Sequence, residues 1–324
     1  MTSAHHISIV RSVSDALKKR VVSHPQFASA MASCERILAR HTLGMSPSGL
    51  FVYGPSGVGK SHVATSFVDR AQSAYGRNNG TILHFTLSGT TALGDVYTDI
   101  LKTLGDPNFT NGTIPGKLNR ITDGLKARGT EIVIFDEMHH LFTAKLAGPK
   151  LLIDIANGLK ALMDSAKVSI LIFGIPDVLR LWHHDQQIRR RFNAPVPLTF
   201  FSYPDDRVTW TAIIKDLLGV LNQCSVTSTL PLGSVSDRTF LASNGSIAIA
   251  SRILNEAAAN ALLRSDTEMS KADFSQAARS IVTVEDGNPM AFELSDAMVA
   301  NACRSHATPQ PAPRAPGVSA VLST

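Results

Sequence analysis

Short apolar runs alternate with stretches of helical periodicity in the first part of the chain. The runs cover residues 50–53, 82–87, 132–135, 169–173 and 196–201, and each is bounded by Gly, Pro or charged residues. Such runs are typical of strands that are buried on both faces of a parallel sheet. Residues 61–72 and 150–166 instead place their apolar side chains on one helical face. The alternation predicts βαβ units, and therefore an α/β domain of three layers with a five-stranded parallel sheet.

Beyond Pro204 the strand pattern stops and the apolar positions follow helical periodicity. Helices are expected over residues 206–221, 236–242, 246–263 and 271–282, and Ser270 with Asp273 forms a capping box before the last of them. The pattern predicts an N-terminal extension (1–35), an α/β core (36–205), a small helical lid domain (206–303) and a tail rich in Pro and Ala (304–324). The tail shows almost no periodicity, and we expect it to be disordered.

Composition narrows the classes of protein to which the chain can belong. Apolar residues make up 44% of the 324 residues, yet no run of about 18 apolar residues occurs, so no membrane span is expected. The N-terminus lacks the pattern of a signal peptide, and the three scattered cysteines fit a reducing cytoplasm. The net charge of +5 permits contact with nucleic acid without requiring it.

A nucleotide-binding motif lies between the first apolar run and the first amphipathic helix. It matches G-x-x-x-x-G-K-[ST] at every fixed position. Its glycines allow backbone N–H groups to approach phosphates, and the lysine reaches the β- and γ-phosphates of ATP. The serine hydroxyl is expected to coordinate Mg²⁺. The residues predicted to bind nucleotide are Gly54, Pro55, Ser56, Gly57, Val58, Gly59, Lys60 and Ser61, with His62 next to them.

Two carboxylates, Asp136 and Glu137, follow the third apolar run directly. Ligands of parallel sheets bind at the carboxyl ends of the strands, so both side chains are expected beside the phosphate loop. We expect Asp136 to hold Mg²⁺ and Glu137 to act as the general base that activates water. His139 and His140 come next, either as groups that communicate with the phosphates or as ordinary surface residues. Adjacent histidines lack the spacing of a metal site.

The motifs FVYGPSGVGKS, IVIFDEMHHLF, ILIFGIPDVL and IRRRFNAPVPLTFF together resemble the AAA+ transposition regulators TniB and TnsC. The resemblance extends over roughly residues 24–263. It implies ATPase activity with Mg²⁺, assembly into rings or spirals on double-stranded target DNA, and contacts with a transposase and a target-selecting protein. It also implies an arginine that completes the site of a neighbouring subunit, for which Arg191 is the first candidate, followed by Arg190 and then Arg189.

Two positions depart from the AAA+ pattern. The fourth strand usually ends in a polar sensor, but Ile175 stands at that position. The lid usually carries an arginine three residues after a glycine, whereas Ala248 follows Gly245 and Arg252 comes one turn later. Arg252 is therefore the candidate substitute for nucleotide contact. Both departures favour slow, regulatory hydrolysis over a fast motor.

Residues 88–128 read as a long, loop-rich segment, and its polar side chains are candidates for DNA contact. Lys, Thr and Asn groups suit contacts to the DNA backbone, which carry no sequence information. The candidates are Thr90, Lys102, Thr113, Lys117, Asn119 and Arg120. Two alternatives stay open for the whole chain: an ATPase of the helicase-loader or replication-initiator type, and an ATPase of secretion or signalling that does not bind DNA.

Overall fold

The computed structural model describes residues 3–78, 80–87, 92–143 and 148–305. These residues form two units. Residues 23–199 make up a sheet unit, and the described residues up to Val22 join those from Phe200 onward in a helical unit. Each unit has its own apolar core. Thr90 and the part of the expected tail beyond Ser305 lie outside the described residues.

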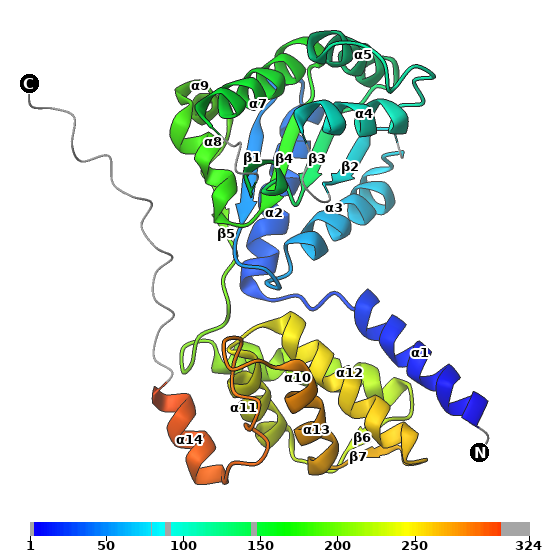
Figure 1. Cartoon of the computed structure of the whole chain (residues 1–324), viewed down its shortest axis with the longest axis vertical. Coiled ribbons are helices and arrows are strands. Elements are labelled where there is room, and N and C mark those ends of the chain that lie inside the picture. The colour runs from blue at the N-terminus through cyan, green and yellow to red at the C-terminus, as the bar shows by residue number, and fades with distance from the viewer. Residues whose placement is uncertain (1–2, 79, 88–91, 144–147, 306–324) are drawn as a thin grey trace, which may run out of the picture. The chain divides into compact units, whose positions relative to one another are not determined.

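The sheet unit contains five parallel strands in the order β2-β3-β4-β1-β5 (Figure 1). Their bounds are Gly49–Tyr53 (β1), Ile82–Thr86 (β2), Ile132–Asp136 (β3), Ser169–Gly174 (β4) and Val196–Pro197 (β5). In the register, Val133 pairs with Ile170 of β4, and Leu50 of β1 pairs with Leu171 of β4. Strand β4 thus separates β1 from β3. The five-stranded parallel sheet predicted from the apolar runs is confirmed.

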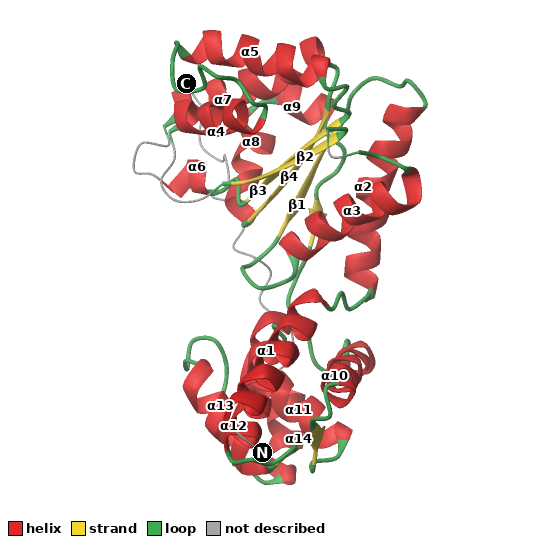
Figure 2. Ribbon diagram, turned by 90° about the vertical axis from the view of Figure 1, so that its right-hand side faces the viewer, coloured by secondary structure: helices red, strands yellow, loops and turns green. Residues whose placement is uncertain are grey.

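Helices cover both faces of this sheet. Figure 2 shows α2 and α3 on one side and α4, α5, α7 and α8 on the other. The second side packs on the sheet through Phe51, Val133, Phe135 and Ile172, all of which are buried. The helical elements are α2 (Pro25–Thr42), α3 (Lys60–Tyr75), α4 (Leu93–Thr103), α5 (Ile114–Ala127), α6 (His140–Thr143), α7 (Pro149–Ala161), the π-helical turn η1 (Leu162–Ala166), the 3₁₀ turn η2 (Pro176–Val178), α8 (Leu179–His184) and α9 (Gln186–Arg191).

Two features of the sheet unit differ from the sequence prediction. Strand β5 ends at Pro197 instead of continuing to residue 201. Leu198 still donates its N–H to the Tyr53 carbonyl at 2.7 Å, but the next N–H, that of Thr199, donates to the side chain of Gln26 at 2.8 Å, so the chain leaves β1 there. The segment expected to be loop-rich contains α4 and α5. Leu93, Val96 and Tyr97 of α4 are buried against the sheet side.

The helical unit surrounds a core that contains Trp210, Phe240, Phe274 and Phe292. Its elements are α1 (Ser3–Lys19), α10 (Arg207–Gln223), β6 (Thr227–Ser228), α11 (Leu232–Ser243), α12 (Ile247–Leu263), β7 (Glu268–Met269), α13 (Lys271–Ile281) and α14 (Asp296–Ser305). Among the helices described in either unit, none combines the length and the apolar character that a bilayer crossing needs.

Both ends of the chain differ from the expected boundaries. Helix α1 does not form an isolated extension, because Val13 and Leu17 enter the core of the helical unit and Arg20 pairs with Asp216 of α10. Helix α14 was not predicted, and it includes Arg304 and Ser305 of the expected tail. Its buried residues are Val299 and Cys303, with Ala302 partly buried beside them, so its apolar signal in the sequence is weak.

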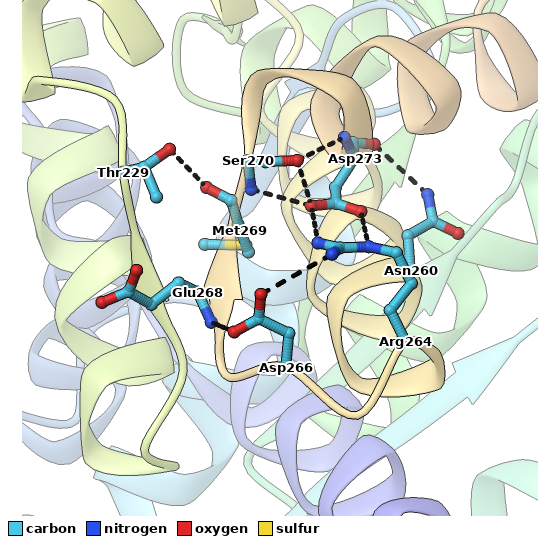
Figure 3. A network of polar contacts seen from close by, with 8 residues as sticks. All are labelled: Thr229, Asn260, Arg264, Asp266, Glu268, Met269, Ser270 and Asp273. Carbon is cyan, nitrogen blue, oxygen red and sulfur yellow. Dashed lines mark hydrogen bonds and ion pairs between the residues drawn. The ribbon is translucent and has the colours of Figure 1, made fainter.

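A network of polar contacts joins α12 to the start of α13 (Figure 3). The Asp273 carboxylate accepts two hydrogen bonds from Arg264, at 3.0 and 2.6 Å, and two more from the backbone N–H and hydroxyl of Ser270. The Ser270 hydroxyl in turn caps the Asp273 N–H, so the predicted capping box is confirmed. The network stabilises the start of α13.

Candidate nucleotide site

The predicted phosphate loop connects β1 to α3, and its backbone conformation explains why glycines stand in it. Gly57 and Gly59 have φ values of 83° and 93°, which side chains with a Cβ rarely adopt. A Cβ on Gly54 would lie 2.0 Å from the carbonyl oxygen of Leu198. The loop therefore leads directly into the N-terminus of α3, where free backbone N–H groups favour the binding of an anion.

Lys60, the first residue of α3, is 4% exposed. Its ammonium donates to the carbonyl oxygens of Gly54 at 3.0 Å and Pro55 at 2.8 Å. Burial lowers the pKa of Lys60, while the charges of Glu137 and Asp136 act in the opposite direction. The cation therefore lies inside the loop and near both carboxylates, where phosphate oxygens can replace the two carbonyl partners.

Asp136 ends β3 and is 1% exposed. Burial raises the pKa of its carboxyl group, but the nearby His84 ring, the Ser61 hydroxyl and the Glu137 N–H together outweigh burial and hold the pKa below its ordinary value. The structure thus brings Ser61 and an ionised Asp136 together. A hydroxyl and a carboxylate are hard oxygen donors of the kind Mg²⁺ prefers, so the residues present fit this ion.

Sequence reasoning missed His84, which lies on β2 with its Nε2 atom 3.9 Å from an Asp136 oxygen. The neighbouring pair Thr86 and Asp136 stands in register across β2 and β3, which brings His84 near the end of β3. A polar residue within an otherwise apolar strand was the available signal. The same pattern does not say which way the side chain points.

Glu137 follows β3 with a φ of 55°, the left-handed region that non-glycine residues rarely adopt. Such a conformation costs on the order of 1–3 kcal/mol and is concentrated at functional sites. The Glu137 carboxylate is half-buried, and one of its oxygens lies 3.2 Å from Nδ1 of His139. The tight turn therefore keeps the carboxylate at the edge of the sheet, on the side of Lys60.

His139 is buried, and its ring lies against that of His140 with 4.4 Å between centroids. Burial lowers the pKa of His139, as do the charges of His140 and Lys60, whereas Glu137 and Asp177 raise it. One ligand atom from each of Glu137, His139 and His140 lies within 4.8 Å of the others. Imidazole donors suit zinc-like ions, so this group is not the site that fits Mg²⁺.

The arginine candidates lie on α9, whose N-terminus is capped by Asp185. Arg191 forms an ion pair of 2.7 Å with Asp164 of the same chain. Arg189 and Arg190 are exposed, and among the described residues neither side chain has a hydrogen bond or ion pair. Arg252 is exposed on α12 of the helical unit.

The candidates for DNA contact separate into two groups. Lys102, Thr113 and Asn119 are exposed. Lys117 is buried, with its ammonium donating to the Thr98 hydroxyl at 2.6 Å, and Arg120 pairs with Asp106 at 3.3 Å. The last two side chains are therefore already engaged within the protein.

A phosphate loop after β1, a carboxylate pair after β3, a strand inserted between them and a helical unit that follows define the AAA+ class of P-loop proteins. The model of the bacterial TniB protein family matches residues 13–202. The chain belongs to this family.

Solved structures show the same fold at low sequence identity. The Aeropyrum pernix ORC2 protein in its ADPNP–ADP complexes has 14% identity and a TM-score of 0.65, covering 82% of this chain and 70% of that chain. Its ADP form has 14% identity and a TM-score of 0.64, covering 82% of this chain and 71% of that chain. The A. pernix ORC1 protein in complex with DNA has 18% identity and a TM-score of 0.59, covering 81% of this chain and 66% of that chain. No curated protein matches the sequence.

Proposed function

We propose that this chain is an ATP-dependent regulator of DNA transposition, which assembles on target DNA and links a target-selecting protein to a transposase. The observation that carries the proposal is the convergence of Lys60, Asp136 and Glu137 at one sheet edge in a TniB-family chain. The fold does not require a buried lysine beside two carboxylates, whereas the binding and hydrolysis of ATP require this arrangement.

The proposed reaction is the hydrolysis of ATP to ADP and phosphate. The oxygen of a water molecule attacks the γ-phosphorus, the bond from that phosphorus to the oxygen bridging the β-phosphate breaks, and Glu137 accepts the proton of the water. Lys60 and the N–H groups of the loop hold the β- and γ-phosphates. Ser61 and Asp136 would hold Mg²⁺, which when bound neutralises phosphate charge.

The nucleotide site is proposed to be shared between subunits. An arginine from the neighbouring copy stabilises the charge that develops on the transferred phosphoryl group. Arg191 remains the first candidate, and it would have to leave its ion pair with Asp164 to reach a phosphate of the neighbouring copy. Arg190 is the second candidate because it is exposed on the same helix.

The proposed DNA contact is a backbone contact made by the assembled protein. Lys102, Thr113 and Asn119 are exposed and offer donors to phosphate oxygens without reading bases. Affinity should then depend on nucleotide and salt, but little on sequence.

The test is duplex DNA binding with and without a non-hydrolysable ATP analogue, for the wild type and the Lys60→Ala protein. We expect tight binding only when the wild type has the analogue. The slope of log affinity against log salt should be about −0.9 for each phosphate neutralised. Equal affinity without nucleotide, or a strong sequence preference, would contradict the proposal.

A replication-initiator role is the second candidate, favoured by the likeness to the two ORC proteins, one of which is solved with DNA. This role predicts preferred DNA sequences and no requirement for the protein during transposition in cells. A third role, without DNA, predicts that duplex DNA leaves ATP turnover unchanged. Transposition assayed with the Lys60→Ala protein separates the first role from both others.

A further inference from the structure

His139 lies where the ends of β3 and β4 meet. The N–H of the preceding residue, Met138, donates to the carbonyl of Phe173 at 3.1 Å, which ties the turn to β4. A Cβ on Gly174 would approach Nδ1 of His139 to 3.5 Å and its backbone nitrogen to 3.4 Å. These are ordinary van der Waals distances, so the imidazole lies beside the last residue of β4.

The Nδ1 atom of His139 faces the proposed general base without a formed hydrogen bond. It lies 3.2 Å from a Glu137 oxygen, but the alignment is poor, and among the described residues this buried nitrogen has no hydrogen-bond partner. A buried polar atom without a partner is uncommon and needs an explanation. Hydrogen bonds at active sites are often misaligned before substrate binds and tighten in the complex.

No polar side chain stands at the usual sensor position of β4. Ile175 follows the strand and is partly buried, and Asp177 two residues later is exposed. The imidazole of His139 is the polar group that the described chain places against the β4 end beside Glu137.

We propose that His139 is a positioning residue, which orients the Glu137 carboxylate toward the attacking water and replaces the polar sensor that β4 lacks. Its Nδ1–H donates to one carboxylate oxygen and leaves the other free to accept the proton. The left-handed φ of Glu137 fixes the position of its backbone, and the hydrogen bond from His139 orients its carboxylate. This role rests on the proposed ATP hydrolysis.

Three substitutions at one position test the role of the Nδ1 atom. Asparagine places its amide nitrogen near the position of Nδ1, glutamine reaches the position of Nε2, and leucine keeps the bulk without a donor. We expect His139→Leu to lower kcat about 10- to 100-fold with KM for ATP unchanged, since misplacement of a catalytic group by about 1 Å can cost that much. His139→Asn should recover most of the rate and His139→Gln little of it. His184→Leu, at an exposed histidine of α8, is the matched control and should stay within about twofold of the wild type.

A double-mutant cycle shows whether His139 acts through Glu137. In the Glu137→Gln background, His139→Leu should cause no further loss, because the group it positions is gone. ATP affinity measured by calorimetry for each protein confirms that the site is folded. Wild-type kcat in His139→Leu, an equal loss in His139→Asn, a rise in KM alone, or an additive loss in the double mutant would each overturn the inference.

Failure of this inference differs from failure of the proposed function. A wild type without ATP turnover, or a Glu137→Gln protein as active as the wild type, removes the proposed function itself. A Glu137→Gln protein that loses turnover beside a fully active His139→Leu protein removes only the role of His139.

Discussion

Two polar clusters, one in each unit, illustrate opposite uses of buried charge. In the helical unit, the carboxylate of Asp273 is 2% exposed, and Arg264 and Ser270 satisfy both of its oxygens (Figure 3). In the sheet unit, Lys60 has only loop carbonyls as partners, and Nδ1 of His139 has no hydrogen bond among the residues described.

The two clusters differ in whether their polar groups are fully paired within the chain. The Asp273 cluster is complete, because every charge has an opposite charge or a donor within the same chain, and such a network stabilises a fold. The edge of the sheet keeps a cation, two carboxylates and free loop N–H groups close together without closing the network. We expect an anion such as a nucleotide phosphate to complete it. Complete pairing of the polar groups therefore distinguishes a structural cluster from a candidate binding site.

The largest expected effect follows from removing the central cation of the incomplete cluster. Lys60→Ala should abolish ATP binding, because the charge that faces the β- and γ-phosphates is lost. The fold should remain, since the hydrogen bonds of the ammonium within the described residues go to loop carbonyls. Calorimetry measures the affinity, and unchanged ATP affinity would show that the loop is not the nucleotide site.

The next effect tests whether the incomplete cluster is completed by a second subunit. Arg191→Ala should keep ATP affinity but lower hydrolysis by up to about 10³-fold. Mixing it with Lys60→Ala protein should restore part of the rate, because each protein then supplies the half of a shared site that the other lacks. ATPase rate against mixing ratio is the measurement. If the ATPase rate did not recover at any mixing ratio, either Arg190 or Arg189 would be the arginine that completes the neighbouring site, or the site would not be shared.

The complete cluster should affect stability and leave ATP binding unchanged. Asp273→Ala leaves the Ser270 N–H and Arg264 without their acceptor, and we expect a loss of about 1–3 kcal/mol in the free energy of unfolding. Urea denaturation measures this loss, and calorimetry provides the control for ATP affinity. A loss of ATP binding without a loss of stability would contradict the division between the clusters.

The smallest effect is a pH dependence of the same cluster. Burial raises the pKa of Asp273, but hydrogen bonds from Arg264 and Ser270 outweigh it, so the pKa is lowered in the folded state. The contribution to stability is therefore present above the unfolded carboxyl pKa of about 3.9 and is lost as pH falls through the folded value. Acid unfolding of Asp273→Asn should lack this component, and an identical acid profile in both proteins would contradict it.

Local patterns in the sequence predicted strands β1 to β4 well, since an apolar run depends on neighbouring residues. These strands agree with the apolar runs to within one residue. Ser61 and Asp136 lie together, and their roles toward nucleotide and Mg²⁺ stay predictions. Helix α4 was missed although Leu93, Val96, Tyr97 and Ile100 carry a clear helical periodicity. That signal was present and was outweighed by the surrounding Gly, Thr and Asn residues.

Contacts between distant parts of the chain could not be predicted in the same way. The placement of α1 in the helical unit depends on its packing, through Val13 and Leu17, in a core shared with the distant helices α10 and α12. Whether a polar residue is free or engaged is also a property of the fold. Lys117 and Lys102 look alike in the sequence, yet one is buried against Thr98 and the other is exposed.

The central claim is that the sheet edge hydrolyses ATP with Glu137 as the base, and single-turnover hydrolysis by Glu137→Gln, with the protein in excess over ATP, tests it most directly. Glutamine keeps the size of the side chain but cannot accept the proton. We predict that ATP affinity equals that of the wild type while the rate falls by about 10²–10⁴-fold, and that the protein accumulates as stable assemblies on duplex DNA. A hydrolysis rate equal to that of the wild type would contradict the account.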